Sequence, residues 1–549
     1  MTIFSGVSPV RDYIKLPTEF MILMVGIILW VKRTSWEGVW NNRIFIILSG
    51  LIVWSSFSDL IAHTFSIQIL ATNVALCTYL FMTAAGAWHW SFIVRICALV
   101  PLIAIIEYAY IGHFFFNNVA GYMALALIAL PCTVYLTYCC FRRGKRIHTG
   151  SWLVLASIYL YFIGFSGSRA GWVALFAEIF VLIVIVLYRR NGWTARKLWG
   201  SVCIIILIII SIAFPLYFVR PHSVDGRLTI YEASWNMFLA SPLYGHGSFG
   251  FLREYMTEQA TLLQTINNES RNWLADNPYR TFNAPLSVLV HGGVVEFLLI
   301  LMLLRCIWLH VKLLPLLRCG VVSSIGLGIF LFSLFSYPFE YPIVLLLLVL
   351  FMGVSFSRIH KKDSALQMKT FEKVLSRLLG SGLIVIALWY AYHESCWYHA
   401  AQNMEKGNQQ RALAVYNKLL SPLQSNPLFI YNYAAELNAL ERYEESERVR
   451  KLAENYLCDY DTELLAGDNA LWLRHYDEAE KHLTIAHCMI PNRFMPLFGL
   501  LQVYDMIDLN KADSVARAIV NKPIKVNSVE IEHIVIVAED WLSTGMPIN

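Results

Sequence analysis

The sequence has few charged residues for its length. Of its 549 residues, only 15% are Asp, Glu, Lys or Arg, whereas a soluble domain carries about 25%. Hydrophobic residues make up 57% and come in blocks of roughly 20, each long enough to cross a ~30 Å hydrocarbon layer as a helix. Basic residues nowhere cluster densely enough to bind nucleic acid, although the net charge is +5. The composition therefore excludes an ordinary soluble protein and predicts an all-α polytopic membrane protein with no nucleic-acid partner.

Metal-binding patterns are also missing. Eight of the eleven cysteines lie in or beside apolar blocks, and no CxxC or Cys/His spacing suggests a metal site. We therefore expect neither a metal nor a cofactor. Cys458 and Cys488, in the C-terminal region, could form a disulfide or remain two buried thiols.

A cleavable signal peptide is not expected, because the polar stretch to about Glu19 is followed by an apolar run without a small-residue cleavage site. That run is predicted to be the first of about twelve transmembrane helices. The stretch Pro338–Pro342 between the tenth and eleventh could be a turn or a re-entrant loop. The predicted spans are about 18–32, 43–62, 65–86, 90–110, 118–140, 151–166, 170–189, 197–217, 286–309, 322–337, 341–357 and 377–395.

The positions of Lys and Arg predict the orientation of these spans. Basic clusters, such as the one in 142–146, come at or after the ends of odd-numbered spans, which places those ends in the cytoplasm. Arg11 and Lys15, before the first span, run against this pattern. The membrane domain is predicted to be 1–395, and its long loop 218–285 then lies on the outer side.

Residues 396–549 are predicted to form a second domain on the outer side, because they are polar, helical in pattern and repetitive. Ala412, Ser446, Ala479 and Ala512 are separated by 34, 33 and 33 residues, and Asn426-Pro427 opens a unit. This period, with a small residue where two helices cross, resembles the tetratricopeptide repeat. Such a domain is either a docking surface for a protein partner or for the acceptor, or a stabilising lid.

The outer loop 218–285 contains five arginines and no lysine. Arginine offers a planar fork that binds phosphate or carboxylate at two points, whereas lysine is a hydrated point charge. These arginines either hold a phosphate or diphosphate at the membrane surface or are unrelated surface charges. They are Arg220, Arg227, Arg253, Arg271 and Arg280.

Three shorter features lie near this loop. Arg169, between two spans at the outer face, is a charge at membrane depth that faces a polar cavity or forms a structural salt bridge. Gly245-x-Gly247 allows a tight turn whose backbone amides could bind an anion, or marks an ordinary turn. Asn283 would cap the next span or orient a hydroxyl. His291, two turns further in, is either a packing residue or a catalytic one.

Together these features resemble the O-antigen ligase and polymerase superfamily, which includes bacterial protein O-oligosaccharyltransferases. The similar motifs are Ser166-x-Ser-Arg169-x-Gly, the loop Arg227, Pro242-Leu-x-Gly-x-Gly-x-Phe249 and Asn283-x-x-Leu286, within roughly 150–310. The resemblance implies transfer of a glycan from an undecaprenyl-diphosphate carrier to an acceptor hydroxyl, on the periplasmic face of the bacterial inner membrane and without a metal. It also implies that Arg169 and Arg227 bind the carrier diphosphate. The loop residues Arg220 and Arg280, and Asn283 at the start of the next span, are further candidates for substrate binding.

The sequence departs from the family at one position that matters. Many members have His before the Asn and an acid five positions after the Leu, where this chain has Phe282 and His291. In the family, this His is the proposed base or the residue that orients the acceptor. Either another residue of this chain has that role, or the chain needs no base there, or the chain is inactive. The candidates for a catalytic role are His291, His246, His222 and Glu232.

Three acceptors fit the resemblance. They are lipid A core (a ligase), a second carrier-linked repeat (a polymerase) and a protein Ser or Thr (an O-oligosaccharyltransferase), and motif similarity favours the ligase. The rival from another class is a transporter or flippase of lipid-linked sugar, although no halves of the sequence repeat as they do in many transporters. The third hypothesis is an export scaffold in which the repeat domain carries the function.

Overall fold

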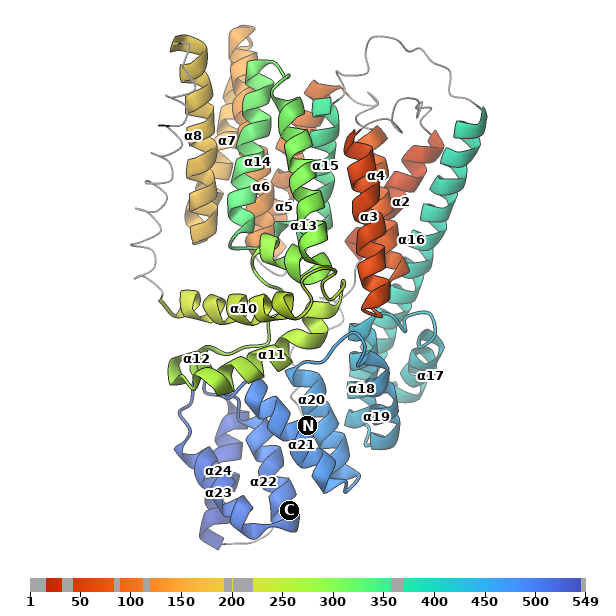
Figure 1. Ribbon diagram of the computed structural model, residues 1–549, viewed down its shortest axis with the longest axis vertical. Coiled ribbons are helices and arrows are strands. Elements are labelled where there is room, and N and C mark those ends of the chain that lie inside the picture. Colours follow the sequence, from red (N-terminus) through yellow and green to blue (C-terminus); the bar gives the residue numbers. More distant parts are fainter. Residues whose placement is uncertain are drawn as a thin grey trace.

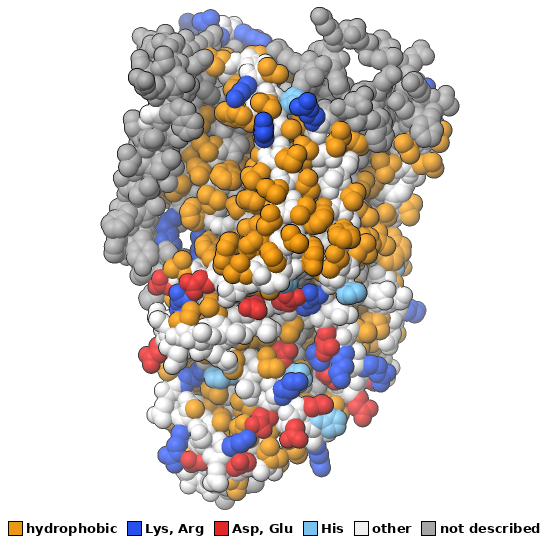
Figure 2. Space-filling model, viewed as in Figure 1, with side chains coloured by type: hydrophobic (Ala, Val, Ile, Leu, Met, Phe, Trp, Pro, Cys, Tyr) orange, Lys and Arg blue, Asp and Glu red, His pale blue; other side chains and the backbone are white. Residues whose placement is uncertain are grey.

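The computed structural model describes residues 16–31, 43–82, 89–111, 119–191, 200, 221–356 and 370–544. An upright bundle of helices forms one half of the molecule, shorter helices including α10 and α11 lie across one end of it, and the C-terminal helices continue beyond them (Figure 1). Apolar side chains cover the visible flank of the bundle, and charged ones gather below it (Figure 2). We refer to the end of the bundle that is crossed by these helices as the α10 end.

Helices occupy eleven of the twelve predicted spans, and seven described helices are long and apolar enough to cross a membrane. The chain is therefore an all-α polytopic membrane protein. The eighth predicted span, 197–217, lies outside the described residues except for residue 200. The helices are α2 (Leu16–Val31), α3 (Arg43–Ile61), α4 (Ile67–Met82), α5 (Trp90–Ile111), α6 (Val119–Arg142), α7 (Arg146–Phe165), α8 (Arg169–Asn191), α13 (Ala284–Val311), α14 (Leu316–Ser333), α15 (Pro342–Phe356) and α16 (Thr370–Glu405).

Helix α6 lies at the centre of the bundle. Every residue of the run from Tyr122 to Cys132 is buried, as expected for a helix that is apolar on all sides. Helices α5, α7 and α14 pack around it, and Gly171 of α8 lets the Met123 side chain approach closely. The core of the membrane domain is built on this helix.

The tenth span differs from the prediction of 322–337. Helix α14 begins six residues earlier, directly after Pro315, and ends at Ser333. The helix cannot continue through Tyr337, because the residue before a proline is disfavoured in helical conformation. Residues Pro338–Glu340 form a 3₁₀ turn that leads straight into α15, so this stretch is a turn.

The long loop predicted at 218–285 is largely helical over its described residues, 221–285. It contains α10 (Pro221–Ala240), α11 (Gly250–Ile266) and α12 (Glu269–Leu274), and α10 and α11 lie across the end of the bundle (Figure 1). Helix α11 buries one face, including Tyr255, Met256 and Leu263. These side chains share one hydrophobic core with the C-terminal domain, so the loop is a packed layer between the two halves.

Helix α16 joins the two halves without a break. It has 36 residues and is therefore about 54 Å long. Leu383 and Ala387 belong to the core of the membrane bundle, whereas Trp397 and Ala401 belong to a core of the C-terminal domain. The predicted domain boundary at 395 lies inside this continuous helix.

The C-terminal helices pack in successive pairs: α16 with α17, α18 with α19, α20 with α21, and α22 with α23. The four small residues of the repeat, Ala412, Ser446, Ala479 and Ala512, are all fully buried in the second helix of a pair. The tetratricopeptide class stays a prediction. The helices are α17 (Gln409–Leu419), α18 (Pro427–Ala439), α19 (Tyr443–Arg450), α20 (Tyr460–Trp472), α21 (Tyr476–Met489), α22 (Met495–Ile507), α23 (Leu509–Asn521) and α24 (Val529–Thr544).

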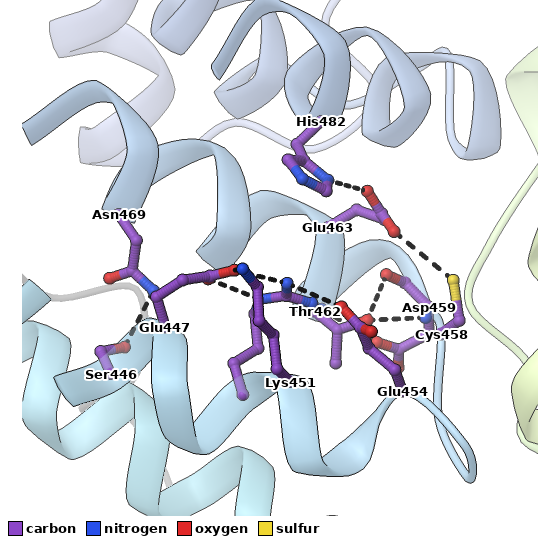
Figure 3. Close-up of polar contacts among 11 residues, drawn as sticks. Ser446, Glu447, Lys451, Glu454, Cys458, Asp459, Thr462, Glu463, Asn469 and His482 are labelled. Carbon is purple, nitrogen blue, oxygen red and sulfur yellow. Dashed lines mark hydrogen bonds and ion pairs between the residues drawn. The ribbon is translucent and has the colours of Figure 1, made fainter. Parts of the chain in front are cut away.

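Buried polar contacts connect successive pairs (Figure 3). The Ser446 hydroxyl donates to the carbonyl of Ala434 at 2.8 Å and accepts from Asn469 Nδ2 at 2.9 Å. Asp459 and Thr462 form a capping box at the start of α20, which satisfies two backbone N–H groups reciprocally. The carboxylate of Asp459 is therefore held in a fixed position. Cys458 and Cys488 are free thiols, so the predicted alternative of a disulfide is wrong.

Candidate functional site

Two of the predicted arginines line one cavity at the α10 end of the bundle. This arginine cavity has a volume of about 440 Å³ and lies between α10, the segment that follows α12, and Tyr337. Arg227 comes from α10 and Arg280 from the segment after α12. The lining residues are Gly226, Arg227, Thr229, Ile230, Gln259, Leu274, Ala275, Asp276, Asn277, Pro278, Tyr279, Arg280, Phe282 and Tyr337.

Arg280 is fixed by two partners. Its Nε donates to the Glu340 carboxylate, and its guanidinium carbon lies 4.6 Å from the centre of the Tyr337 ring. Burial alone would lower the pKa of Arg280, but the Glu340 carboxylate outweighs it and the pKa is raised. The side chain is therefore a permanent cation, and one face of the fork rests on an aromatic ring.

Arg227 has fewer contacts with charged protein groups than Arg280 has. Its guanidinium carbon lies 5.8 Å from the centre of the Phe282 ring, and among the described residues it forms no ion pair. Two other loop arginines do form such pairs, Arg253 with Glu254 and Arg271 with Glu232. Among the described loop arginines, Arg227 is thus the one with the most bonding capacity left for an anionic ligand.

Phe282, at the position where many family members have His, has a strained backbone. Its φ is +53°, a left-handed conformation that is unusual for a bulky residue. The ring contacts both Arg227 and Tyr337, whose ring centre is 5.3 Å away. These contacts therefore hold the Phe282 side chain at the cavity wall. Phenylalanine has no group that can exchange a proton, so Phe282 cannot act as a base there.

A second cavity lies on the opposite side of α10. Its volume is about 530 Å³, and it contains the predicted residues Glu232 and Asn283. Both Glu232 oxygens accept from Arg271. Asn283 caps α13, since its side-chain oxygen accepts from the Leu286 amide at 3.0 Å. The lining residues are Leu228, Tyr231, Glu232, Trp235, Asn236, Leu262, Asn283, Pro285, Leu286 and Leu289.

The turn at Gly245 and Gly247 does not offer an anion site. The amides of His246 and Gly247 donate to the carbonyls of Val290 and His291 at 2.8 and 2.9 Å. The next amide, Ser248, donates to the Asp59 carboxylate at 2.6 Å. The protein itself therefore occupies these donors. Gly245 serves the close packing of this turn on α13, and Gly247 serves its close packing on residues 59–64 at the end of α3.

His246 is a structural cation rather than a base. Its Nδ1 lies 2.5 Å from Glu254 Oε2, and its Nε2 lies 2.6 Å from the carbonyl of Met237. Burial by itself lowers the pKa of His246. The hydrogen bonds to Glu254 and Met237 together raise it by more than burial lowers it, so the pKa is raised overall. Both ring nitrogens face acceptors, so neither is available to take a proton.

His291 also has both ring nitrogens engaged. Its Nδ1 lies 2.6 Å from Glu296 Oε2, and its Nε2 lies 3.1 Å from the Ser248 hydroxyl. Ser248 in turn donates to Asp59 of α3 at 3.0 Å. This network joins three separate parts of the chain, and His291 does not line either cavity.

The other predicted residues that the structure describes do not line the arginine cavity. Arg169 is the first residue of α8 and is half-buried, but it lines neither cavity. The structure thus brings Arg227 together with Arg280 rather than with Arg169. Arg220, and the side chain of His222, lie outside the described part of the chain. Within that part, no three His, Cys, Asp or Glu side chains gather as a metal site.

Sequence reasoning missed the polar residues Gln259, Asn277 and Tyr337 of the arginine cavity. Gln259 is an isolated polar residue on the buried face of α11, which is the one signal that could have identified it. Asn277 and Tyr337 stand in no motif, and only the folded chain brings them together.

Comparison with known proteins gives one family. Residues 152–301 match the family model described as O-Antigen ligase. The matched region extends from α7 to α13 and contains Arg169, Arg227, Arg280 and Asn283. No curated protein matches the chain.

Proposed function

We propose that this chain, whose residues 152–301 match the O-antigen ligase family model, transfers a glycan from an undecaprenyl-diphosphate carrier to an acceptor hydroxyl. We further propose that the α10 end of the bundle faces the periplasm of a bacterium, with the bundle in the inner membrane. The observation that carries the proposal is the pairing of Arg227 and Arg280 on one cavity at this end.

The chemistry requires stabilisation of a leaving group. The acceptor oxygen forms a bond to the anomeric carbon and loses its hydroxyl proton to water, and the bond between that carbon and the diphosphate oxygen breaks. Negative charge then builds on the diphosphate, where preorganised cations lower the barrier. Arg280 is held by Glu340 and Tyr337, so it requires little reorganisation, and Arg227 supplies a second fork. In this proposal, Phe282 does not act as a general base.

The ligase is the preferred member of the superfamily because the motifs resemble ligases, with lipid A core as acceptor. A protein acceptor or a second carrier-linked glycan would make it an O-oligosaccharyltransferase or a polymerase. The position of the cavity favours a transferase over a transporter. Transporters usually bind their substrate near the middle of the bilayer, whereas this cavity is built from α10, the segment that follows α12 and Tyr337, at the end of the bundle.

The direct test is transfer by the purified protein in vitro. Undecaprenyl-diphosphate glycan would be offered with lipid A core, with periplasmic protein and with each omitted, and the release of free undecaprenyl diphosphate would be followed. Release that requires an acceptor supports the transferase, and the acceptor consumed identifies the branch. Release with no acceptor present indicates hydrolysis, and no release with any acceptor contradicts the proposal.

A further inference from the structure

One wall of the arginine cavity is formed by the end of α12 and the segment without regular secondary structure that follows it. We call residues 272–280 the rim segment. Its last seven residues, from Leu274 to Arg280, all line the cavity. After α12 ends at Leu274, the segment forms neither helix nor strand. Such a segment cannot fix its own backbone, so contacts from elsewhere must hold it.

The C-terminal domain supplies these contacts to the backbone. The side-chain amide of Asn492 donates to three carbonyls of the rim segment, at 3.3 Å (Asn272), 3.0 Å (Trp273) and 2.8 Å (Ala275). Lys525 Nζ donates to the carbonyl of Trp273 at 2.7 Å. Asn492 and Lys525 thus hold the part of the rim segment where α12 ends.

A second group of contacts acts on the middle of the rim. Asn277 Nδ2 donates to Asp459 at 3.0 Å and to Asp461 at 3.2 Å. Asp459 is itself held by the capping box at the start of α20, beside Thr462 (Figure 3). Gln259 Nε2 links both sides, since it donates to the carbonyls of Asp276 and Met489 at 3.0 and 2.9 Å.

From these contacts we infer that the C-terminal domain is part of the donor site, with Asn492 and the Asp459–Asp461 pair as positioning residues for the rim segment and hence for Arg280. This inference rests on the proposed function, because it concerns the same cavity. A two-point grip on a diphosphate depends on the position of the guanidinium, and displacements of about 1 Å lower catalysis severely. A loose rim would also have to become ordered on binding, which weakens affinity.

The test compares two matched variants of the full-length protein in detergent. Asn492→Ala removes the contacts to the rim segment. Asn438→Ala is the control, because Asn438 is equally half-buried and its amide donates only within the C-terminal domain, to Asp468 and Asn469. Hydrogen exchange reports on the rim segment, and the affinity for inorganic diphosphate reports on the cavity. Neither measurement requires an acceptor.

We expect Asn492→Ala to speed exchange in the rim segment and to weaken diphosphate binding about tenfold, whereas Asn438→Ala changes neither. Asn492→Gln, which keeps an amide donor, should recover part of the affinity. If Asn492→Ala does not fold, Lys525→Gln removes an exposed contact to the same segment and should act in the same direction.

The outcomes separate the two proposals. Unchanged exchange, or unchanged diphosphate affinity despite faster exchange, would overturn the positioning role while leaving the proposed function intact. An equal effect of Asn438→Ala would also overturn it, because the effect would then be one of general stability. If the wild-type protein binds no diphosphate, the proposed donor site fails, and the role of Asn492 in it fails with it.

Discussion

Substitution of Gly245 by Ala tests how the turn between α10 and α11 is held. Gly245 has a φ of +66°, and a Cβ there would overlap the carbonyls of His291 and Val290. Gly144 is a matched control, because its φ is +70° but a Cβ would meet no atom within 4 Å. Left-handed backbone costs an L-residue about 1–2 kcal/mol at either position.

Only Gly245→Ala must also displace the turn from α13. Two backbone hydrogen bonds, from His246 and Gly247 to α13, would then be strained or broken, each worth about 0.5–1.5 kcal/mol. We therefore expect Gly245→Ala to lower the free energy of unfolding by about 1–3 kcal/mol more than Gly144→Ala does. Denaturant unfolding in detergent measures this difference. Equal losses for the two variants would refute the reasoning, because they would show that the close approach of the two backbones adds nothing.

Three further results are expected. Arg280→Lys keeps a charge near Glu340 but loses the fork, so the release of carrier diphosphate should slow by about tenfold or more; an unchanged rate would contradict a two-point role. Burial and the nearby Asp459 carboxylate raise the pKa of Asp461 to about 7, and a raised folded-state pKa contributes stability at low pH that is lost as the pH rises. The Tm should therefore fall as the pH rises from about 4 to about 7, and Asp461→Asn should flatten that fall; an equally steep profile in the variant would contradict this. Since Cys458 and Cys488 are free thiols, a thiol reagent should titrate both after unfolding without reductant, and a Tm that falls on reduction would argue against free thiols.

The membrane helices could be predicted because the signal is local. A run of about 20 apolar residues has few alternatives to a spanning helix, and the all-α membrane fold is confirmed. Boundaries were less accurate where a single residue decides them, as at Pro315 and Pro338 around α14. The continuity of α16 was also missed, because the change from apolar to polar composition at about residue 395 marks where the helix leaves the membrane and not where it ends.

The candidate site could be predicted only in part. The lysine-free set of arginines directed attention to Arg227 and Arg280, which line one cavity. The sequence could not show that Arg253 and Arg271 are paired with acids, nor that the amides around Gly247 are occupied. The contacts of Asn277 with Asp459 and Asp461 join residues that are more than 180 positions apart, and no local pattern encodes such a pairing.

The measurement that tests the central claim most directly is the binding and consumption of undecaprenyl-diphosphate glycan by Arg227→Lys. Lysine keeps the charge but cannot bind a diphosphate at two points. Arg517→Lys is the control, since Arg517 lies exposed on α23 and pairs with Asp513. The account predicts that Arg227→Lys lowers acceptor-dependent release of carrier diphosphate by at least about tenfold, while Arg517→Lys leaves it unchanged. Equal release by the wild type and both variants would contradict the account.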